Sequence, residues 1–362
     1  MTVAVKRVLF VVRPDAHTRP GGDLVHAEQT AQALRGLGVA VDVVPSLSPD
    51  ARGYDLAHVF GVFEPDTVDR QLTALEAGGI PIVLSPIWLD LAPFFHTAPR
   101  IERALRARSP AAIGRALAKI AGDHRVPRWS RATDRRRRAQ RAAMLRAAVL
   151  LPASNVEAYL YASELGLSHV PFVVVPLGVD EAPFAAPRPV VRAGVICCAR
   201  IEPKKNQAAL LYALRDIDVD VTLIGDAYDE RYANLCRTFA TPRTRFVGHA
   251  SRAEVFVRMA GAAVHAHPSW LESPGLSSLE AAAAGARLVV GDRGTEREYF
   301  GSDVAYADPA DVGGIRTAVL RALDAAPRER GDALELRLRA RTWQRTAEAT
   351  LEAYARALAG RR

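Results

Sequence analysis

The chain has 362 residues, 49% of them hydrophobic, and a formal net charge of +8 at pH 7. A chain of this length is expected to form two domains of about 150 to 180 residues, each with a full core. No run of 18 apolar residues occurs, which excludes a spanning helix. The three cysteines lack C-x-x-C spacing and favour buried thiols in a reducing compartment, so we expect a cytoplasmic protein.

The first predicted elements are a strand at residues 9–12, a helix from about Leu24 to Leu37, and a second strand, which together make a βαβ unit. The loop before the helix ends in Gly21 and Gly22, where the backbone can approach a ligand closely, although such a pair is usually only a turn. The loop is not a G-x-G-x-x-G fingerprint, which removes the main support for nicotinamide binding.

Short apolar runs at residues 56–63 and 80–89 alternate with a segment of helical spacing at residues 68–79. This alternation predicts a mostly parallel sheet. Asp90 follows the second run, and its carboxylate is a candidate either for contacting a ligand hydroxyl or for capping the next helix.

Residues 100–146 carry fifteen Lys or Arg against three acidic residues, so the rest of the chain is net negative. This basic helical segment, with Trp129 near its densest run, fits an anionic membrane surface or an anionic ligand, and equally a solvated face of arginines. We expect no nucleic-acid binding, because no base-stacking motif accompanies the charge.

The linker between the domains is predicted at residues 179–189, which are rich in proline. A strand, a basic loop and a helix then open the second domain. Arg200 and Lys205 flank a turn made by Pro203, so both can face one anion at the carboxyl end of the strand, although isolated basic residues are usually surface charges.

Asp216, Asp218 and Asp220 alternate and could suggest a metal site. They lie where a helix enters a strand, which is the wrong end of a parallel sheet for chemistry, and we expect no metal there.

Residues 262–292 predict a strand, a polar loop with Pro274 and Gly275, a helix and a second strand. A loop that ends in glycine and opens a helix suits a phosphate. Glu272 in the loop and Glu280 in the helix could accept hydrogen bonds from hydroxyl groups. A nucleotide sugar offers a diphosphate between two hydroxyl-bearing rings, although this spacing alone also fits a solvated acidic pair.

The run from Pro268 to Val290 closely resembles the Glu-x7-Glu signature of the retaining nucleotide-sugar glycosyltransferases of family 4. The resemblance implies the GT-B fold, an α/β architecture of two Rossmann-like, doubly wound domains that face a central cleft. It implies that Glu272 contacts the donor sugar and Glu280 the ribose hydroxyls. Ser273 and Pro274 stand where the family usually has Gly-Phe, so the sugar pocket is expected to differ in shape.

The same resemblance extends to the rest of the donor side. Arg200 and Lys205 match the residues that hold the donor diphosphate, and His249 falls near the nucleotide base. Gly275 and Leu276 are retained on the phosphate side, followed by Ser277. The family generally needs no metal, so we expect no cofactor beyond a donor such as a UDP- or GDP-sugar.

On the acceptor side, Gly22 and His26 match a Gly-Gly followed four residues on by His, with Gly21 as the first glycine. His26 by itself would be read as a helix-surface histidine. Many family members place a histidine near the reacting carbon, where this chain has Trp88, Leu89 and Asp90. That catalytic histidine is therefore not carried across.

The expected layout has an acceptor-side domain at residues 1–178, which includes the basic segment, a nucleotide-sugar domain at residues 190–342, and a terminal helix at residues 343–362 that crosses back. We expect an enzyme that moves a sugar to a glycan, lipid-linked or small-molecule acceptor at the inner face of the membrane or in the cytoplasm. The alternatives are a non-catalytic nucleotide-sugar-binding subunit, an epimerase of the same fold, and a basic membrane scaffold.

Overall fold

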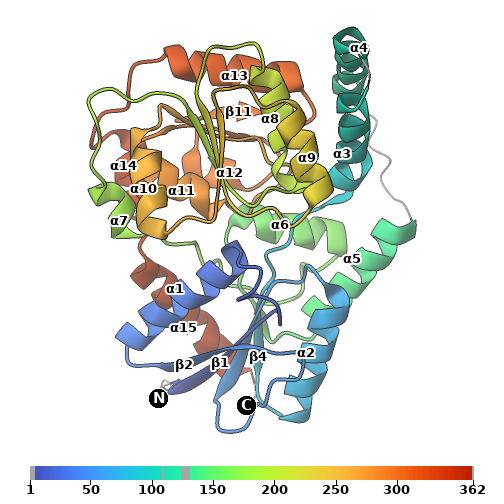
Figure 1. Ribbon diagram of the computed structural model, residues 1–362. Helices are drawn as coiled ribbons and strands as arrows, with labels where there is room; N and C mark the ends of the chain where they lie inside the picture. Colours follow the sequence, from blue (N-terminus) through green and yellow to red (C-terminus); the bar gives the residue numbers. More distant parts are fainter. Residues whose placement is uncertain (1–4, 108, 124–130, 361–362) are drawn as a thin grey trace. The chain divides into compact units, whose positions relative to one another are not determined.

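The computed structural model describes residues 5–107, 109–123 and 131–360 (Figure 1). The chain divides into two compact units. Unit 1 consists of Met1–Asp90, Trp129–Gly178 and Arg341–Arg362, and unit 2 consists of Leu91–Arg128 and Val179–Ala340. Each unit contains one parallel sheet with helices on both faces, as the alternation of strand and helix patterns predicts.

The sheet of unit 1 has five parallel strands in the order β2-β1-β3-β4-β5. Their bounds are β1 (Arg7–Val12), β2 (Ala40–Pro45), β3 (Leu56–Phe60), β4 (Ile82–Ser85) and β5 (Val149–Leu150). Side chains alternate across β1: Val8 and Phe10 enter the core on one face, and Leu9 and Val11 enter the core on the other. Both faces of a parallel sheet are covered, which explains the almost continuously apolar strands.

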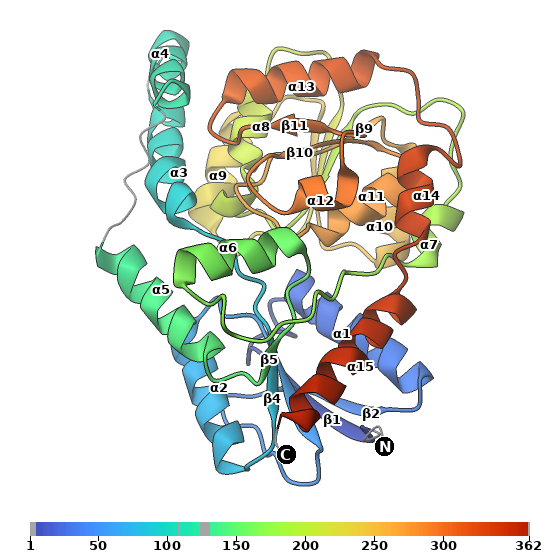
Figure 2. The ribbon, with the colours of Figure 1, turned by 180° about the vertical axis from the view of Figure 1, so that it is seen from behind.

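Two helices cover the first of these faces, α1 (Gly22–Gly36) and the terminal helix α15 (Trp343–Ala359), which lie side by side (Figure 2). The buried face of α15 includes Ala347, Ala353 and Ala357, whose small side chains permit close packing. The other face carries α2 (Pro65–Ala77), α5 (Arg131–Met144) and α6 (Asn155–Leu165). Ser154 is the N-cap of α6, and its hydroxyl accepts a hydrogen bond from the Glu157 amide.

The sheet of unit 2 has six parallel strands in the order β11-β10-β9-β6-β7-β8. Their bounds are β6 (Val195–Cys198), β7 (Val221–Ile224), β8 (Thr244–Gly248), β9 (Val264–His267), β10 (Arg287–Gly291) and β11 (Ala305–Ala307). The chain adds β7 and β8 on one side of β6 and β9 to β11 on the other. The order therefore reverses between β6 and β9, and open α/β sheets bind ligands beyond the carboxyl ends of the strands at such a point.

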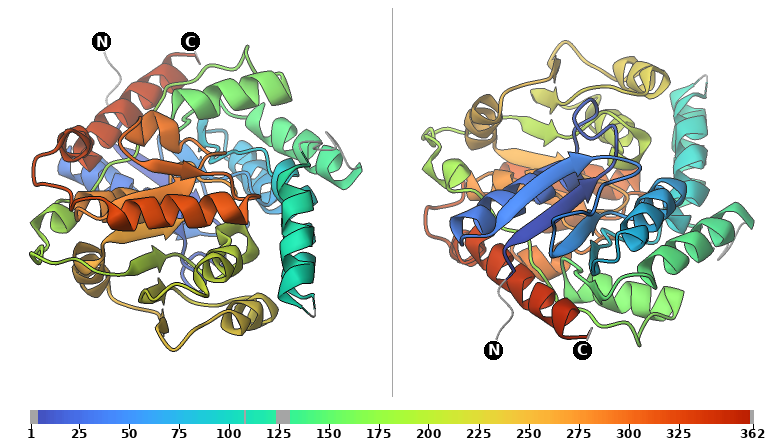
Figure 3. Two further views of the ribbon diagram at one scale, coloured as in Figure 1. Left: turned by 90° about the horizontal axis from the view of Figure 1, so that it is seen from above. Right: turned by 90° about the horizontal axis from the view of Figure 1, so that it is seen from below.

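Helices surround this second sheet. Figure 3 shows α13 (Val312–Asp324) lying across it, where it packs against β9, β10 and β11. The others are α7 (Glu181–Ala185), the 3-10 turn η1 (Pro203–Lys205), α8 (Gln207–Leu214), α9 (Glu230–Thr238), α10 (Arg252–Gly261), α11 (Leu276–Ala283), α12 (Glu296–Phe300) and α14 (Ala333–Arg339). Residues 179–189, expected as a linker, belong to unit 2 and contain α7.

Helices α3 (Ala92–Leu105) and α4 (Pro110–Ala121) also belong to unit 2, whereas the expected layout assigns all of residues 1–178 to one N-terminal domain. Helix α3 packs against α8 and η1. Its buried residues Ala98, Ile101 and Leu105 follow a helical period, so one face of α3 is covered. The basic segment at residues 100–146 is therefore divided, with α3 and α4 in unit 2 and α5 in unit 1; Trp129 lies outside the described residues.

The three cysteines, Cys197, Cys198 and Cys236, are free and buried. Burial raises the pKa of the Cys197 and Cys236 thiols to about 12. In the part of the chain that the structure describes, no helix combines the length and the apolar character needed to cross a membrane.

Candidate functional site

Two loops of unit 2 are joined at the point where the strand order reverses. One follows β6 and contains Arg200 and Lys205, and the other follows β9 and leads to Glu272. Asn206 has a φ of 62°, a left-handed conformation that asparagine tolerates better than most residues. Its side-chain amide donates to the carbonyls of Pro268 (3.2 Å) and Pro309 (2.9 Å). Asn206 thus adopts the left-handed turn conformation after η1 and also connects the loop after β6 to the loop after β9.

A buried ion pair lies at this junction. The Lys205 Nζ donates to Glu272 Oε1 at 2.6 Å, and the two side chains are only 13% and 9% exposed. Ser269 Oγ donates to the same oxygen, also at 2.6 Å. Burial by itself would raise the pKa of Glu272, but the charge of Lys205 outweighs it and holds that pKa well below its usual range. The carboxylate is therefore ionised at neutral pH.

The two oxygens of Glu272 are not equivalent. The hydrogen bonds from Lys205 and Ser269 both end on Oε1, and the described residues donate no hydrogen bond to Oε2. A carboxylate oxygen has lone pairs that readily accept from a hydroxyl group. Glu272 can therefore accept a ligand hydroxyl on Oε2 while Oε1 stays anchored.

The helix α11 begins beside this carboxylate. Gly275 is its N-cap, and a Cβ added there would lie 3.4 Å from His267 Nδ1 and 3.5 Å from Glu272 Cγ. The first-turn N–H groups at Leu276 and Ser277 cannot pair within the helix, and they carry the positive end of its dipole. The predicted helix start is confirmed, and its amides lie next to Glu272, where an anion could bind.

Three arginines occupy the other end of α11, where the sequence indicated no special feature. Arg188 donates to the Ala283 carbonyl at 2.7 Å, Arg328 to the Ala282 carbonyl at 2.8 Å, and Arg192 to the Gly285 carbonyl. The last carbonyls of a helix lack the usual amide partner four residues on, and cations at a carboxyl terminus interact favourably with the helix dipole. The short alanine-rich helix is thus held at its far end.

Glu280 projects from the middle of α11 and is largely buried. Its Oε1 accepts from Arg252 of α10 at 2.8 Å, and Arg252 also pairs with Asp180. Burial raises the pKa of Glu280 to about 7, and the neighbouring charge of Arg252 only partly offsets this. Glu280 therefore changes its charge near neutral pH.

Arg200 and His249 lie in loops after β6 and β8. The Arg200 guanidinium is 3.3 Å from Glu202 Oε1 and its carbonyl accepts from Gln207 Nε2 at 2.8 Å. His249 is 77% exposed, with Nδ1 3.6 Å from Asp226 Oδ2. Both loops follow the carboxyl ends of strands in the same sheet as Glu272, which is the edge where such sheets bind ligands.

The candidate acceptor-side residues all belong to unit 1. Gly21 is the N-cap of α1 and Gly22 its first residue. His26 is buried, not on the helix surface, because its ring packs edge-on against Phe60 with the ring centroids 5.2 Å apart. Burial lowers the pKa of His26 to about 4. Asp90 is half-buried and does not cap α3, whose N-cap is the following residue.

Trp88 stands in the loop where the family has its histidine. Its backbone N–H donates to Glu157 Oε1 at 2.7 Å and its indole Nε1 to Gln140 Oε1 at 3.0 Å. The residue before it, Ile87, has a φ of 48°, which is unusual for a β-branched side chain. Trp88 is therefore a core residue that fixes the loop.

The three aspartates at residues 216–220 pair with arginines. Arg243 contacts Asp218 at 2.5 Å and Asp220 at 3.2 Å, and Arg316 contacts Asp216. These carboxylates form ion pairs with arginines and lie away from the loops of the Glu272 site.

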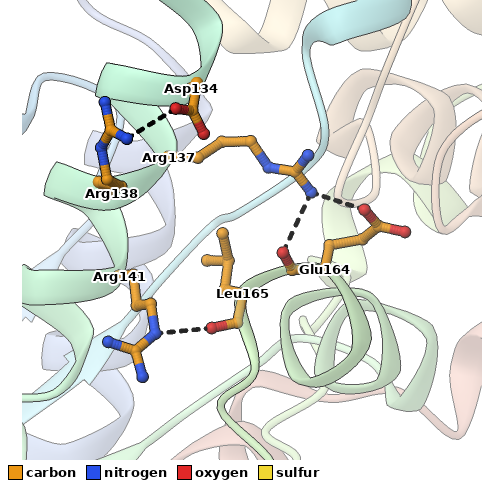
Figure 4. A pocket seen from close by; sticks show the side chains of 6 residues that line it. All are labelled: Asp134, Arg137, Arg138, Arg141, Glu164 and Leu165. Carbon is orange, nitrogen blue, oxygen red and sulfur yellow. Dashed lines mark hydrogen bonds and ion pairs between the residues drawn. The ribbon is translucent and has the colours of Figure 1, made fainter. Parts of the chain in front are cut away.

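An open pocket of about 480 Å³ lies in unit 1 between α5 and α6 (Figure 4). Its lining is Asp134, Arg137, Arg138, Arg141, Glu164 and Leu165. Arg138 pairs with Asp134 at 2.7 Å, and the buried Arg137 pairs with Glu164 at 2.6 Å. Some arginines in the densest part of the basic segment therefore make ion pairs that hold α5 in place, and the segment is not only a solvated face.

The sequence patterns did not indicate two residues of the Glu272 site, His267 and Ser269. His267 is the last residue of β9, 1% exposed, with Nε2 3.6 Å from Glu272 Oε1. A polar residue at the carboxyl end of an apolar strand is the signal that could have indicated it.

Part of the chain resembles known proteins in sequence. Residues 180–334 match the family described as glycosyl transferases group 1. A glycogen synthase from Mycobacterium tuberculosis is 33% identical over 212 residues, which cover 54% of this chain and 51% of that protein. The chain thus spans about half the length of the curated relatives it matches.

Solved structures match over nearly the whole chain. Sucrose-phosphate synthase from Thermosynechococcus elongatus superposes with a TM-score of 0.72 at 17% identity, covering 98% of this chain and 100% of that one. Anabaena HepE in complex with UDP-glucose gives 0.64 at 16% identity, covering 97% and 95%. The UDP-forming trehalose-phosphate synthase from Burkholderia xenovorans gives 0.64 at 11% identity, covering 96% and 99%. The chain therefore has the GT-B fold, and its residues 180–334 match the model of the glycosyl transferases group 1.

Proposed function

We propose that the protein is a retaining glycosyltransferase of family 4. It would move a sugar from a UDP- or GDP-sugar to a glycan, lipid-linked or small-molecule acceptor, in the synthesis of a cell-surface polysaccharide or glycolipid. The observation that carries the proposal is the Lys205–Glu272 pair beside the start of α11, at the point where the strand order of unit 2 reverses.

The donor diphosphate would lie against the start of α11. The amides of Leu276 and Ser277 and the cations of Arg200 and Lys205 would face the charge that grows on the leaving phosphate as the glycosidic bond breaks. Donors fixed in place before the reaction stabilise such charge without reorganising. We propose that these cations, and not a metal ion, carry this role.

The two carboxylates would recognise the two rings. Glu272 would accept a donor-sugar hydroxyl on its free Oε2, and Glu280 would accept the ribose hydroxyls in exchange for its contact with Arg252. For the transfer itself, the departing phosphate would take the proton of the acceptor hydroxyl on the same face of the sugar. No protein nucleophile is then needed.

The first donor to test is UDP-glucose, because the structure of HepE was determined with it. A thermal-shift panel of UDP- and GDP-sugars identifies the donor, since a ligand at 100 times its Kd adds about 2.7 kcal/mol of stability. Turnover is then measured with candidate acceptors. Binding without turnover by any acceptor would favour a nucleotide-sugar-binding subunit, for which the absent loop histidine is the supporting observation.

Replacing Arg200 or Lys205 with Ala should lower turnover roughly 10² to 10³-fold, the scale for losing one donor that stabilises transition-state charge. Arg321→Ala is the matched control, because Arg321 is exposed on α13. If both site variants stay folded and keep the turnover of the control at saturating donor, the diphosphate role is wrong.

The assignment of the two carboxylates is tested separately by calorimetry. Glu280→Ala should weaken binding of the nucleoside diphosphate, whereas Glu272→Ala should weaken only binding of the sugar-bearing donor. Equal losses for both ligands in both variants would contradict this division.

A further inference from the structure

His267 leaves an unused hydrogen-bonding atom inside the Glu272 site. Its side chain is buried at the end of β9, and its Nε2 has no hydrogen-bond partner among the described residues. That atom is 3.6 Å from Glu272 Oε1, which is just beyond a hydrogen bond. A buried polar atom without a partner in a native protein requires an explanation.

The surroundings of the ring decide which nitrogen carries the proton. The Ser278 hydroxyl of α11 lies between His267 Nδ1 and His265 Nε2, 3.4 Å from each. If this hydroxyl donates to His267 Nδ1, then Nε2 of His267 carries the proton and faces the carboxylate. The opposite arrangement would direct a nitrogen lone pair at a negatively charged oxygen, which is unfavourable.

The charged and titratable groups that face His267 are Glu272 in the loop after β9, Lys204 and Lys205 in η1, and His265 on β9 itself. Burial, more than these charges, lowers the pKa of His267 to about 4. The ring is therefore neutral at pH 7 and presents one N–H group to Glu272.

We propose that His267 is a positioning residue for Glu272. When the donor diphosphate draws the Lys205 ammonium towards itself, the His267 Nε2–H closes onto Glu272 Oε1 and takes the place of the ammonium. This inference rests on the proposed function, and it deepens that function by explaining how the sugar-binding carboxylate keeps its orientation in the donor complex.

The geometry requires little movement. Lys205 makes one hydrogen bond to Glu272 and has two further N–H donors, so a diphosphate can compete for it. Ser269 stays on Oε1, and a shift of about half an ångström brings His267 Nε2 within hydrogen-bonding distance. With two donors on Oε1, the other oxygen still faces the ligand.

The test compares His267→Phe, which removes the donor, with His267→Gln, whose amide can place an N–H near the position of Nε2. His265→Phe is the matched control, because His265 is equally buried on the same strand and shares the Ser278 hydroxyl but does not contact Glu272. Affinities for UDP and UDP-glucose are measured by calorimetry, or for GDP and GDP-mannose if the wild type prefers them.

His267→Phe should weaken binding of the nucleotide sugar about tenfold or more, equivalent to about 1.4 kcal/mol, because a hydrogen bond to a charged group is lost. It should change the affinity for the nucleoside diphosphate by no more than about twofold, and His267→Gln should restore most of the loss. His265→Phe should not discriminate between the two ligands.

Unchanged affinity of His267→Phe for the nucleotide sugar, or equal losses for both ligands, would overturn the inference while leaving the function intact. A wild-type protein that binds no nucleotide sugar would instead refute the function, and the inference with it. If His267→Phe does not fold, nitrogen-15 NMR of histidine in the wild-type protein decides. We expect the Nε2–H tautomer, with its proton moving downfield when the nucleotide sugar is added, and an unchanged resonance would reject the role.

Discussion

Replacing Lys205 with Met tests whether the charge of Lys205 keeps Glu272 ionised inside unit 2. The substitution keeps an unbranched side chain but removes the cation that is hydrogen-bonded to Glu272, whose side chain is only 9% exposed. Removing one partner of a buried ion pair costs about 3 to 5 kcal/mol. We expect about 3 kcal/mol at pH 7, the lower end, because Ser269 still donates to the same oxygen.

The loss should depend on pH in a defined direction. The pKa of Glu272 lies below its unfolded value of 4.5, so the pair contributes stability above pH 4.5 that is lost as pH falls through the folded pKa. Without the charge of Lys205, the burial of the carboxylate is less well offset, so the pKa of Glu272 rises relative to wild type. The variant can then relieve its buried charge by binding a proton, and its deficit relative to wild type should shrink as the pH falls from neutral towards the unfolded pKa of 4.5.

Amide hydrogen exchange of peptides from β9 and α11 measures the local free energy of opening, which avoids treating two units as one transition. The double variant Lys205→Met/Glu272→Leu should recover part of the loss, because replacing both charges by apolar groups is often neutral. The double variant could instead lose as much opening free energy as the two single variants together, or the loss in Lys205→Met could be independent of pH. Either result would show that the ion pair does not cause the loss of stability.

Three further outcomes are expected. The pKa of Glu280 is raised from 4.5 to about 7, so stability present below pH 4.5 is lost as pH rises through 7. Glu280→Gln should therefore gain about 3 kcal/mol in free energy of unfolding at pH 8 and little at pH 4.5. An equal gain at both pH values would contradict burial of the charged carboxylate as the cause. Asn206→Ala should cost about 2 to 3 kcal/mol by denaturant unfolding, and Asn206→Gly about 1 kcal/mol less, because both lose two hydrogen bonds but only alanine strains the left-handed backbone. If the basic segment docks on membrane, sedimentation with anionic liposomes should fade at high salt. Changing the exposed Arg135 and Arg138 to Glu should weaken liposome binding by about 1 kcal/mol or more per residue, whereas Arg137 is kept because its pair with Glu164 is structural. Absence of sedimentation at low salt would point to a soluble acceptor.

Local patterns in the sequence were sufficient for the alternation of strands and helices and for the glycine-ended loop before α11. They also indicated that Arg200 and Lys205 follow one strand and that Glu272 follows another. These features depend on the period of apolar residues and on turn residues within a few positions of one another. The strand order then explains why the two loops meet, since β6 and β9 are neighbours where the order reverses.

Only the tertiary structure decided the features that depend on partners distant in sequence. The assignment of α3 and α4 to unit 2 depends on which surface covers their apolar faces, and amphipathic spacing does not identify that surface. In the same way, the folded structure shows that His26 is a core residue, that Glu280 pairs with Arg252, and that His267 faces Glu272. A side chain's charge and hydrogen bonds follow from its surroundings, and folding brings those surroundings together from separate parts of the chain.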